Sequence, residues 1–185
     1  MNALRLLTLI LATATIGACA TPSTSNLEMD DDKFGGYIIG VRPDDVGLNI
    51  FPGTAEDGEF KSSFWGLESF SGNVADGYVV GREKDSARLA IIRMWQGPLF
   101  GNTSGVFAPC EGREAMTFEI EGGRVIYLGD VTFKFALPIT VTSSVDHDLE
   151  AAEEFIRANY PEYSGEVVQR SFEMLRNEES CTVYY

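Results

Sequence analysis

The sequence predicts a mainly β domain, a β-sandwich or open barrel, with one helix in its C-terminal half at about residues 147–160. Short runs of β-branched and aromatic residues recur between turn residues, which is typical of antiparallel strands. A single segment has apolar residues at clear helical spacing. Strands and helices do not alternate along the chain, as they do around a parallel sheet. The length of 185 residues suits one domain with a tail.

The composition limits the classes of function. With 44% hydrophobic and 23% charged residues, the chain is globular rather than disordered or fibrous. Asp and Glu number 28 against 14 Lys and Arg, so the formal net charge is −14. Binding a nucleic acid takes clustered Lys and Arg, so we expect no nucleic-acid partner. An acidic surface favours a basic protein partner instead.

Residues 1–18 have the layout of an export signal, because Arg5 precedes an apolar run over residues 6–18. The run of about 13 residues is shorter than the roughly 20 that cross a bilayer. It ends in Ile16-Gly17-Ala18-Cys19, which resembles the lipobox of bacterial lipoproteins. The resemblance implies cleavage before Cys19 and a lipid on Cys19 that anchors the chain to the membrane. Because Ala20 rather than Asp follows, analogy with the enterobacterial sorting rule favours the outer membrane. We expect the domain to face the periplasm, and the cell surface is the alternative. Secretion without a lipid is the alternative.

Two further segments follow the signal. Residues 19–34 form a predicted acidic polar tether, and residues 35–185 a single β-rich domain. The tether contains Pro22 and the adjacent acids of residues 30–32. These acids lack the D-x-D-x-D-G spacing of a calcium loop, so we interpret the segment as a solvated tail.

Strands are expected where β-branched and aromatic runs are bounded by turn residues. The first half of the domain offers residues 37–41, 46–51, 77–80 and 88–95. A turn is predicted at Pro43-Asp44-Asp45, and Pro52-Gly53 ends the second strand. Residues 53–63 and 96–105 are predicted loops.

The clearest local unit is a predicted hairpin over residues 116–128. Gly122-Gly123 between two alternating runs permits the positive φ angles of a type I′ turn. In that register Glu121 faces Arg124, an opposite-charge pair. The residues that then share one face are Met116, Phe118, Ile120, Val125 and Tyr127.

The rest of the β pattern follows this unit. Gly129-Asp130 predicts a turn or a bulge before a further alternating run over residues 131–137. Pro138 restricts the next strand, residues 139–142, to a sheet edge or a fresh start. Residues 165–176 fit either a helix or a strand, and residues 181–185 a final short strand.

The helix lies between these segments. Asp146 or Asp148 caps it, and Pro161 ends it. Its apolar stripe consists of Leu149, Ala152, Ile156 and Tyr160, widened by Phe155.

Residues 121–131, EGGRVIYLGDV, resemble a recurrent segment of uncharacterised bacterial lipoproteins with a transthyretin-like or carboxypeptidase-regulatory-like β-sandwich. An aliphatic strand ending near Arg93-Met94-Trp95 and a late helix ending in Asn159-Tyr160-Pro161 also fit this family. The resemblance implies a β-sandwich in the bacterial envelope. It carries no catalytic residues.

If Cys19 carries a lipid, Cys110 and Cys181 are left as an even pair in an oxidising compartment. A disulfide between them would close a loop of about 71 residues and stabilise the fold by roughly 4 kcal/mol in the chain-entropy model. It would fix the end of the chain to the body of the domain. Two buried or free thiols are the alternative.

Little in the sequence points to catalysis. The single histidine, His147, lies between Asp146 and Asp148 and close to Ser143 and Ser144. A catalytic triad draws its groups from separate elements, and adjacent helix positions do not converge on one metal ion. We therefore expect no metal site, no cofactor and no enzyme activity. A hydrolase that uses two of the abundant carboxylates is the alternative.

The aromatic residues Trp65 and Phe100 lie near predicted loops and form a possible glycan-binding pair, although core packing is the usual fate of such residues. Trp95 ends an aliphatic strand and is assigned to the core. We predict a lipid-anchored envelope protein with a non-catalytic binding or scaffolding role. Its expected partners are the membrane, through Cys19, and a basic envelope protein or peptidoglycan. A carbohydrate- or peptidoglycan-binding module is the alternative binding function.

Overall fold

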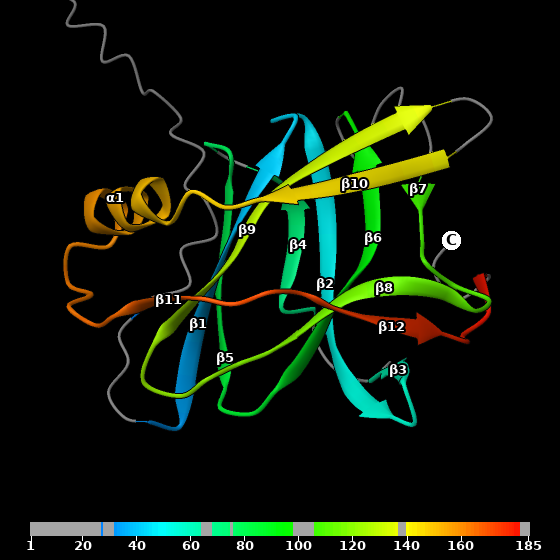
Figure 1. The fold of residues 1–185 in the computed structure, drawn as a ribbon, viewed down its shortest axis with the longest axis horizontal. Helices are drawn as coiled ribbons and strands as arrows, with labels where there is room; N and C mark the ends of the chain where they lie inside the picture. The colour runs from blue at the N-terminus through cyan, green and yellow to red at the C-terminus, as the bar shows by residue number, and fades with distance from the viewer. Residues whose placement is uncertain are drawn as a thin grey trace, which may run out of the picture.

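The computed structural model describes residue 27 and residues 32–63, 68–74, 76–97, 106–136 and 140–181. Strands hold 59% of these residues, so the predicted mainly β class is confirmed (Figure 1). The described elements are β1 (Phe34–Arg42), β2 (Val46–Glu56), β3 (Glu59–Ser62), β4 (Phe70–Asn73), β5 (Tyr78–Lys84), β6 (Arg88–Gln96), β7 (Val106–Phe107), β8 (Arg113–Glu119), β9 (Val125–Ala136), β10 (Thr140–Asp146), α1 (Leu149–Asn159), β11 (Val167–Gln169) and β12 (Glu173–Asn177).

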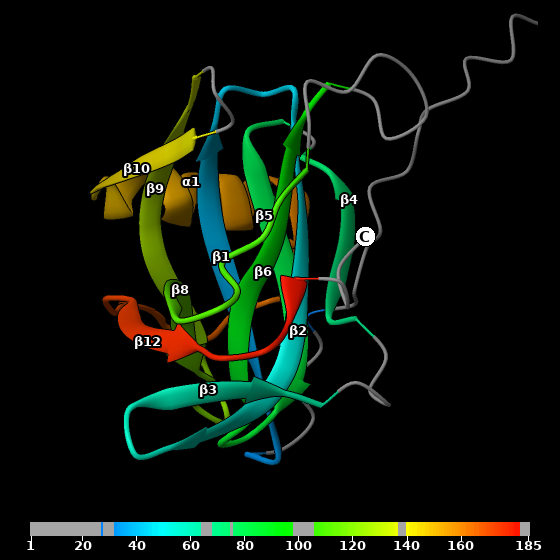
Figure 2. The ribbon, with the colours of Figure 1, turned by 90° about the vertical axis from the view of Figure 1, so that its right-hand side faces the viewer.

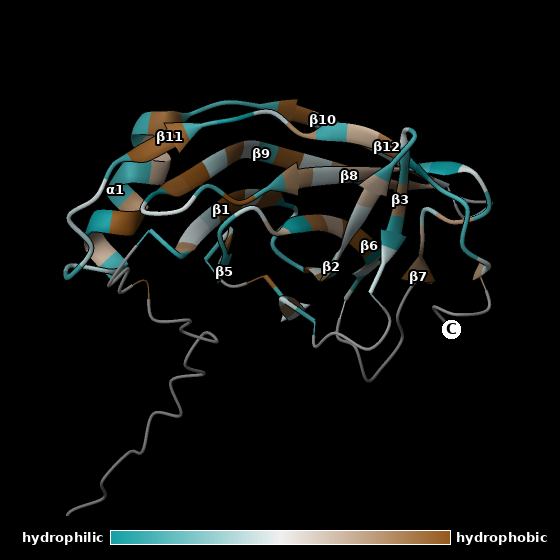
Figure 3. Cartoon of the chain, turned by 90° about the horizontal axis from the view of Figure 1, so that it is seen from below, coloured by the Kyte–Doolittle hydropathy of each residue, from teal (hydrophilic) through white to brown (hydrophobic). Residues whose placement is uncertain are grey.

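The first sheet has the strand order β10-β9-β1-β5, with β11 beside β9. β9 is parallel to β1 and β11 and antiparallel to β10. β10 forms an outer edge of the sheet (Figure 3). The strand predicted over residues 139–142 is therefore at a sheet edge, as expected, but it extends to Asp146, and residue 139 lies outside the described residues.

The second sheet closes on itself. β2 pairs with β3 and β6, β6 pairs with β8, β8 with β12, and β12 with β3. These strands form a barrel-like ring; in Figure 2, β2 and β6 run lengthwise, and β3 and β12 run across the view. β4 adds to β2, and β7 adds to β6. The structure thus combines two facing sheets with closure of one of them.

Three apolar clusters hold these layers together. The intersheet cluster lies between the sheets and is built by inward residues of β1, β2, β6, β8 and β9. The helix cluster lies between the first sheet and α1 and includes Ile38 and Ile156. The ring cluster lies inside the ring and includes Phe60, Ala90 and Leu175.

The predicted hairpin over residues 116–128 is wrong. β8 pairs with β6 and β12 in the second sheet, whereas β9 pairs with strands of the first, so the chain crosses between the sheets at Gly122-Gly123. Gly123 has a φ of 75°, but Gly122 packs against the Asp32 carbonyl and is not in the left-handed region. A type I′ turn requires that region at both positions. The predicted pair between Glu121 and Arg124 does form, at 3.6 Å between Oε2 and Nη1.

The crossing also corrects the predicted shared face. Met116 and Phe118 lie in the intersheet cluster, as expected. Val125 and Tyr127, however, face α1 in the helix cluster. The two strands lie in different sheets, so the register of a shared turn does not determine which residues of β9 face the same side as those of β8.

Gly129 makes the predicted bulge. Between Tyr127 and Asp130, β9 gains one residue relative to β1, and Gly129 adopts a φ of 102°. The bulge changes which side chains face inward, so Leu128 before it and Val131 after it both join the intersheet cluster. One long strand replaces the two separate runs that the sequence indicates.

The predicted loop over residues 53–63 is also wrong. β2 continues through Pro52-Gly53 and turns back into β3 at Asp57 and Gly58, whose φ angles are 52° and 78°. Two consecutive left-handed residues make the type I′ hairpin turn for which Asp-Gly is a preferred pair. The Asp57-Gly58 pair in the sequence signals this turn, but Pro52 and the acidic flanking residues favoured a loop.

α1 confirms the predicted helix. The Asp148 side chain caps it by accepting a hydrogen bond from the Ala151 N–H at 3.1 Å, and Ala152 and Ile156 are buried. The segment over residues 165–176, which fitted either a helix or a strand, forms β11 and β12. Cys181 is not part of a strand, and residues 182–185 lie outside the described residues. No helix in the described ranges is long and apolar enough to cross a membrane.

Leu27 belongs to the predicted tether but is fully buried in the helix cluster. β1 likewise begins at Phe34, inside the predicted tether. The domain therefore takes in residues that composition alone assigns to a solvated tail.

Replacing Leu27 with Ala is expected to lower the free energy of unfolding by about 3 kcal/mol, because a buried leucine leaves a cavity in the helix cluster. Urea unfolding followed by tryptophan fluorescence measures this. Met174 is 47% exposed, so Met174→Ala is the control and should change the free energy by less than about 0.5 kcal/mol. Equal effects of the two substitutions would show that Leu27 does not pack in the folded protein.

Candidate functional site

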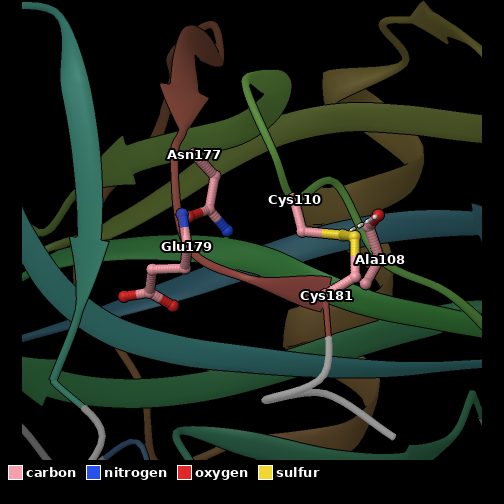
Figure 4. Close-up of a disulfide and its surroundings, with 5 residues drawn as sticks. All are labelled: Ala108, Cys110, Asn177, Glu179 and Cys181. Carbon is pink, nitrogen blue, oxygen red and sulfur yellow. Dashed lines mark hydrogen bonds between the residues drawn. A yellow bond between two sulfur atoms is a disulfide. The ribbon is translucent and has the colours of Figure 1, made fainter.

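The predicted disulfide between Cys110 and Cys181 is confirmed (Figure 4). Their Cα atoms lie 5.2 Å apart, and Cys110 is fully buried in the ring cluster. Backbone hydrogen bonds join the same two segments, from Glu111 N to Glu179 O at 2.9 Å and from Gly112 N to the Asn177 carbonyl at 2.8 Å. The bridge fixes the segment after β12 to the body of the domain.

Four carboxylates gather where β9, β10 and the start of α1 meet. We call Asp130, Asp146, Asp148 and Glu150 the acidic corner. Asp130 and Asp146 are register partners on β9 and β10, Asp148 caps α1, and Glu150 lies in its first turn. Together they put negative charge on one end of the first sheet.

The buried Tyr127 hydroxyl holds the acidic corner in place. It donates a hydrogen bond to Asp130 Oδ2 and accepts one from the Asp148 N–H at 2.9 Å. The Asp130 carboxylate lies over Gly40, where a Cβ would be 1.8 Å from Oδ1. The absence of a side chain at Gly40 therefore lets this carboxylate reach the tyrosine.

Both hydrogen bonds of the Tyr127 hydroxyl are made within the domain. Burial, followed by the hydrogen bond to Asp130, raises the pKa of Tyr127 well above its ordinary value of 10.0. The hydroxyl therefore stays protonated at neutral pH. The exposed His147 ring meets the Tyr127 ring edge-on, with 6.2 Å between centroids. In the described part of the chain no hydrogen bond joins His147 to Ser143 or Ser144.

The raised pKa of Tyr127 predicts a loss of stability at alkaline pH. Above about pH 10 the tyrosine of the unfolded chain ionises while the folded one stays neutral, so the free energy of unfolding falls as the pH rises. Tyr127→Phe should reduce the slope of this fall between pH 9 and 11 (about one unit on each side of the ordinary pKa). Denaturant titrations at each pH measure it. Identical slopes would mean that the hydroxyl is not buried as described.

Ion pairs are distributed unevenly over the described surface. Arg88 bonds Glu119 and Glu173 at 2.8 and 2.5 Å, and Arg170 bonds Glu121. By contrast, no carboxylate of the acidic corner forms an ion pair with a Lys or Arg in the described ranges. Nor do any three His, Cys, Asp or Glu side chains of those ranges come close enough together to hold a metal ion. The corner carries uncompensated charge that can attract a cationic partner.

A hollow of about 300 Å³ lies between α1 and the segment that leads to β11. Glu153 and Arg157 of α1 and Glu166 of the following segment line it. The Tyr163 hydroxyl, also in the lining, accepts from the Val125 N–H at 3.0 Å and donates to the Glu166 carbonyl at 2.7 Å. These bonds join the segment before β11 to β9.

A polar face lies on β2, β4 and β6. The Asn49 amide donates to Ser71 Oγ at 2.8 Å, and the buried Trp95 indole donates to Asn73 Oδ1 at 3.2 Å. Arg93, the register partner of Asn49, has a buried Nε without a hydrogen-bond partner among the described residues. Neither the bulge that places Arg93 beside Asn49 nor this unpaired donor was signalled by the sequence.

The structure describes some of the residues that the sequence analysis singled out and not others. Trp95 is fully buried, which confirms its assignment to the core. Cys19, Trp65 and Phe100 lie outside the described residues, so lipidation and the aromatic glycan site stay predictions. In the chain, Trp65 lies between β3 and β4 and Phe100 between β6 and β7, strands that adjoin the polar face.

Comparison with known proteins gives no relative: no family model, no curated protein and no solved structure matches the chain. The resemblance to lipoprotein β-sandwiches therefore stays a prediction. Function has to be argued from the residues and their arrangement.

Proposed function

We propose that the chain is a lipid-anchored protein of the bacterial outer membrane with a non-catalytic role, in which its periplasmic domain binds or scaffolds a basic envelope protein. The observation that carries the proposal is the acidic corner. Its four carboxylates lie at one end of the first sheet and lack ion-pair partners in the described ranges, whereas Glu119, Glu121 and Glu173 are paired with arginines. Complementary charge speeds encounter and selects the partner.

The burial of Leu27 supports a short anchor. Leu27 lies eight positions after Cys19, and a fully extended chain over that distance spans at most about 29 Å. A lipid on Cys19 would therefore keep the helix cluster, and with it the α1 side of the domain, close to the membrane. A domain held at the membrane is better suited to recruit another envelope protein than a domain that diffuses freely in the periplasm.

The non-catalytic role is supported by the state of the reactive groups. Tyr127 is protonated and engaged at both hydrogen-bonding positions of its hydroxyl. Cys110 and Cys181 are joined in the disulfide and offer no thiolate nucleophile. These groups hold the fold together, which suits a binding domain.

Purification in mild detergent at increasing salt tests this function. A basic protein should co-purify with the lipidated chain and dissociate as salt screens the attraction. The double variant Asp146→Asn/Glu150→Gln should weaken the complex about fivefold. The variant Asp57→Asn/Glu114→Gln removes the same charge from exposed positions away from the corner and should leave it unchanged. Equal effects of the two variants would show that the acidic corner is not the surface that binds the basic protein.

A further inference from the structure

β10 is an open strand edge. It pairs with β9 over seven residues in an unbroken register, and its other side has no strand partner in the described part of the chain. No backbone hydrogen bond from residues 140–146 leads away from β9 within that part. A row of backbone donors and acceptors therefore faces outward.

This edge lacks the features that normally prevent strand pairing. Natural edge strands are blocked by lysines, prolines, bulges or short length. Residues 140–145 are uncharged and contain no proline, and β10 has no bulge. Val141 and Val145 pack against the intersheet cluster, while Thr142 and Ser144 are exposed. An added strand with the same alternation would extend both the hydrogen bonding and the apolar face.

We propose that β10 is a strand-addition site for an extended segment of the basic partner protein, an inference that rests on the proposed function. The acidic corner lies at the Asp146 end of β10. An antiparallel segment would bring its amino-terminal end there. The segment therefore carries Lys or Arg at that end, followed by alternating apolar and polar residues.

Charge selects this occupant over a second copy of the chain. Two copies would each bring a formal charge of −14 to the same edge, and like charges oppose association. A cationic segment gains attraction from Asp146, Asp148 and Glu150 instead, and its backbone supplies the pairing that β10 lacks.

The test uses a fluorescent peptide with two lysines at its amino end followed by alternating threonine and valine. Its binding to the full mature protein, measured by anisotropy, should be saturable. Successive N–H groups of a strand point to opposite edges, so either Ser143 or Ser144 presents its N–H outward. Ser143→Pro and Ser144→Pro are both made, and the one that keeps the wild-type melting temperature is the outward variant. It should bind the peptide about tenfold more weakly.

Amide hydrogen exchange on the unaltered protein gives a second readout that does not depend on either variant. The peptide should slow exchange in residues 140–146 and leave β4, an edge strand of the second sheet, unchanged. Undiminished binding by the outward variant, equal protection of β10 and β4, or dimerisation through β10 would overturn the inference. If the outward variant still co-purifies with the basic protein, the proposed function stands and only strand addition fails. If no basic protein co-purifies with the wild type, the proposed function fails instead.

Discussion

Loss of the disulfide between Cys110 and Cys181 is expected to lower the free energy of unfolding by about 4 kcal/mol. The bridge spans 71 residues, and the chain-entropy model assigns that much to a loop of this length. The closed loop contains β8, β9, β10, α1, β11 and β12, so opening it frees much of both sheets in the unfolded state. Guanidinium titration of the oxidised and reduced protein measures the difference without any substitution.

Cys181→Ser serves as the matched variant for this experiment. It leaves Cys110 in the ring cluster and should unfold at the same denaturant concentration as the reduced wild type. If the oxidised and reduced proteins share one midpoint, the bridge does not restrain the chain and its stabilising role is refuted.

Replacing Cys19 with Ala is expected to release the protein from the membrane almost completely. The lipobox resemblance makes Cys19 the lipid attachment point, and the buried methylenes of the acyl chains contribute about 0.8 kcal/mol each to membrane binding. Without them, a chain of formal net charge −14 is repelled by anionic headgroups. Fractionation of cells into membrane and soluble periplasmic material measures the change.

Ser23→Ala is the control for this experiment because it alters the same predicted tether without touching the lipid site. It should leave the protein in the membrane fraction. A Cys19→Ala protein that stays membrane-bound would refute the anchor, and with it the orientation inferred from Leu27.

The sequence predicted the strands better than their partners. Alternation of residue types identified most runs that became strands, because it depends only on which side chains can be half-buried. The alternation could not show that β8 and β9 belong to different sheets. Two strands joined at Gly122-Gly123 show the same pattern of residue types whether they form a hairpin in one sheet or belong to two sheets. Leu27 was missed because one apolar residue among polar ones has no periodicity.

The candidate site was predictable in part. The cysteine pair followed from counting, and the exposed edge from Pro138. The acidic corner did not, because the bond between Tyr127 and Asp130 requires the bulge at Gly129 and the missing side chain at Gly40. Each of those glycines was visible in the sequence, but their joint effect depends on how β1 and β9 pair.

Cross-linking of the lipidated protein in living cells, followed by mass spectrometry, tests the central claim most directly. A photoreactive residue at Thr142, which is exposed on β10, should capture one dominant basic envelope protein, with the cross-link mapped to an extended segment that has Lys or Arg at its amino-terminal end. Absence of a protein cross-link, together with retention of the chain on the peptidoglycan fraction, would contradict a protein-binding role and favour a glycan-binding one at Trp65 and Phe100.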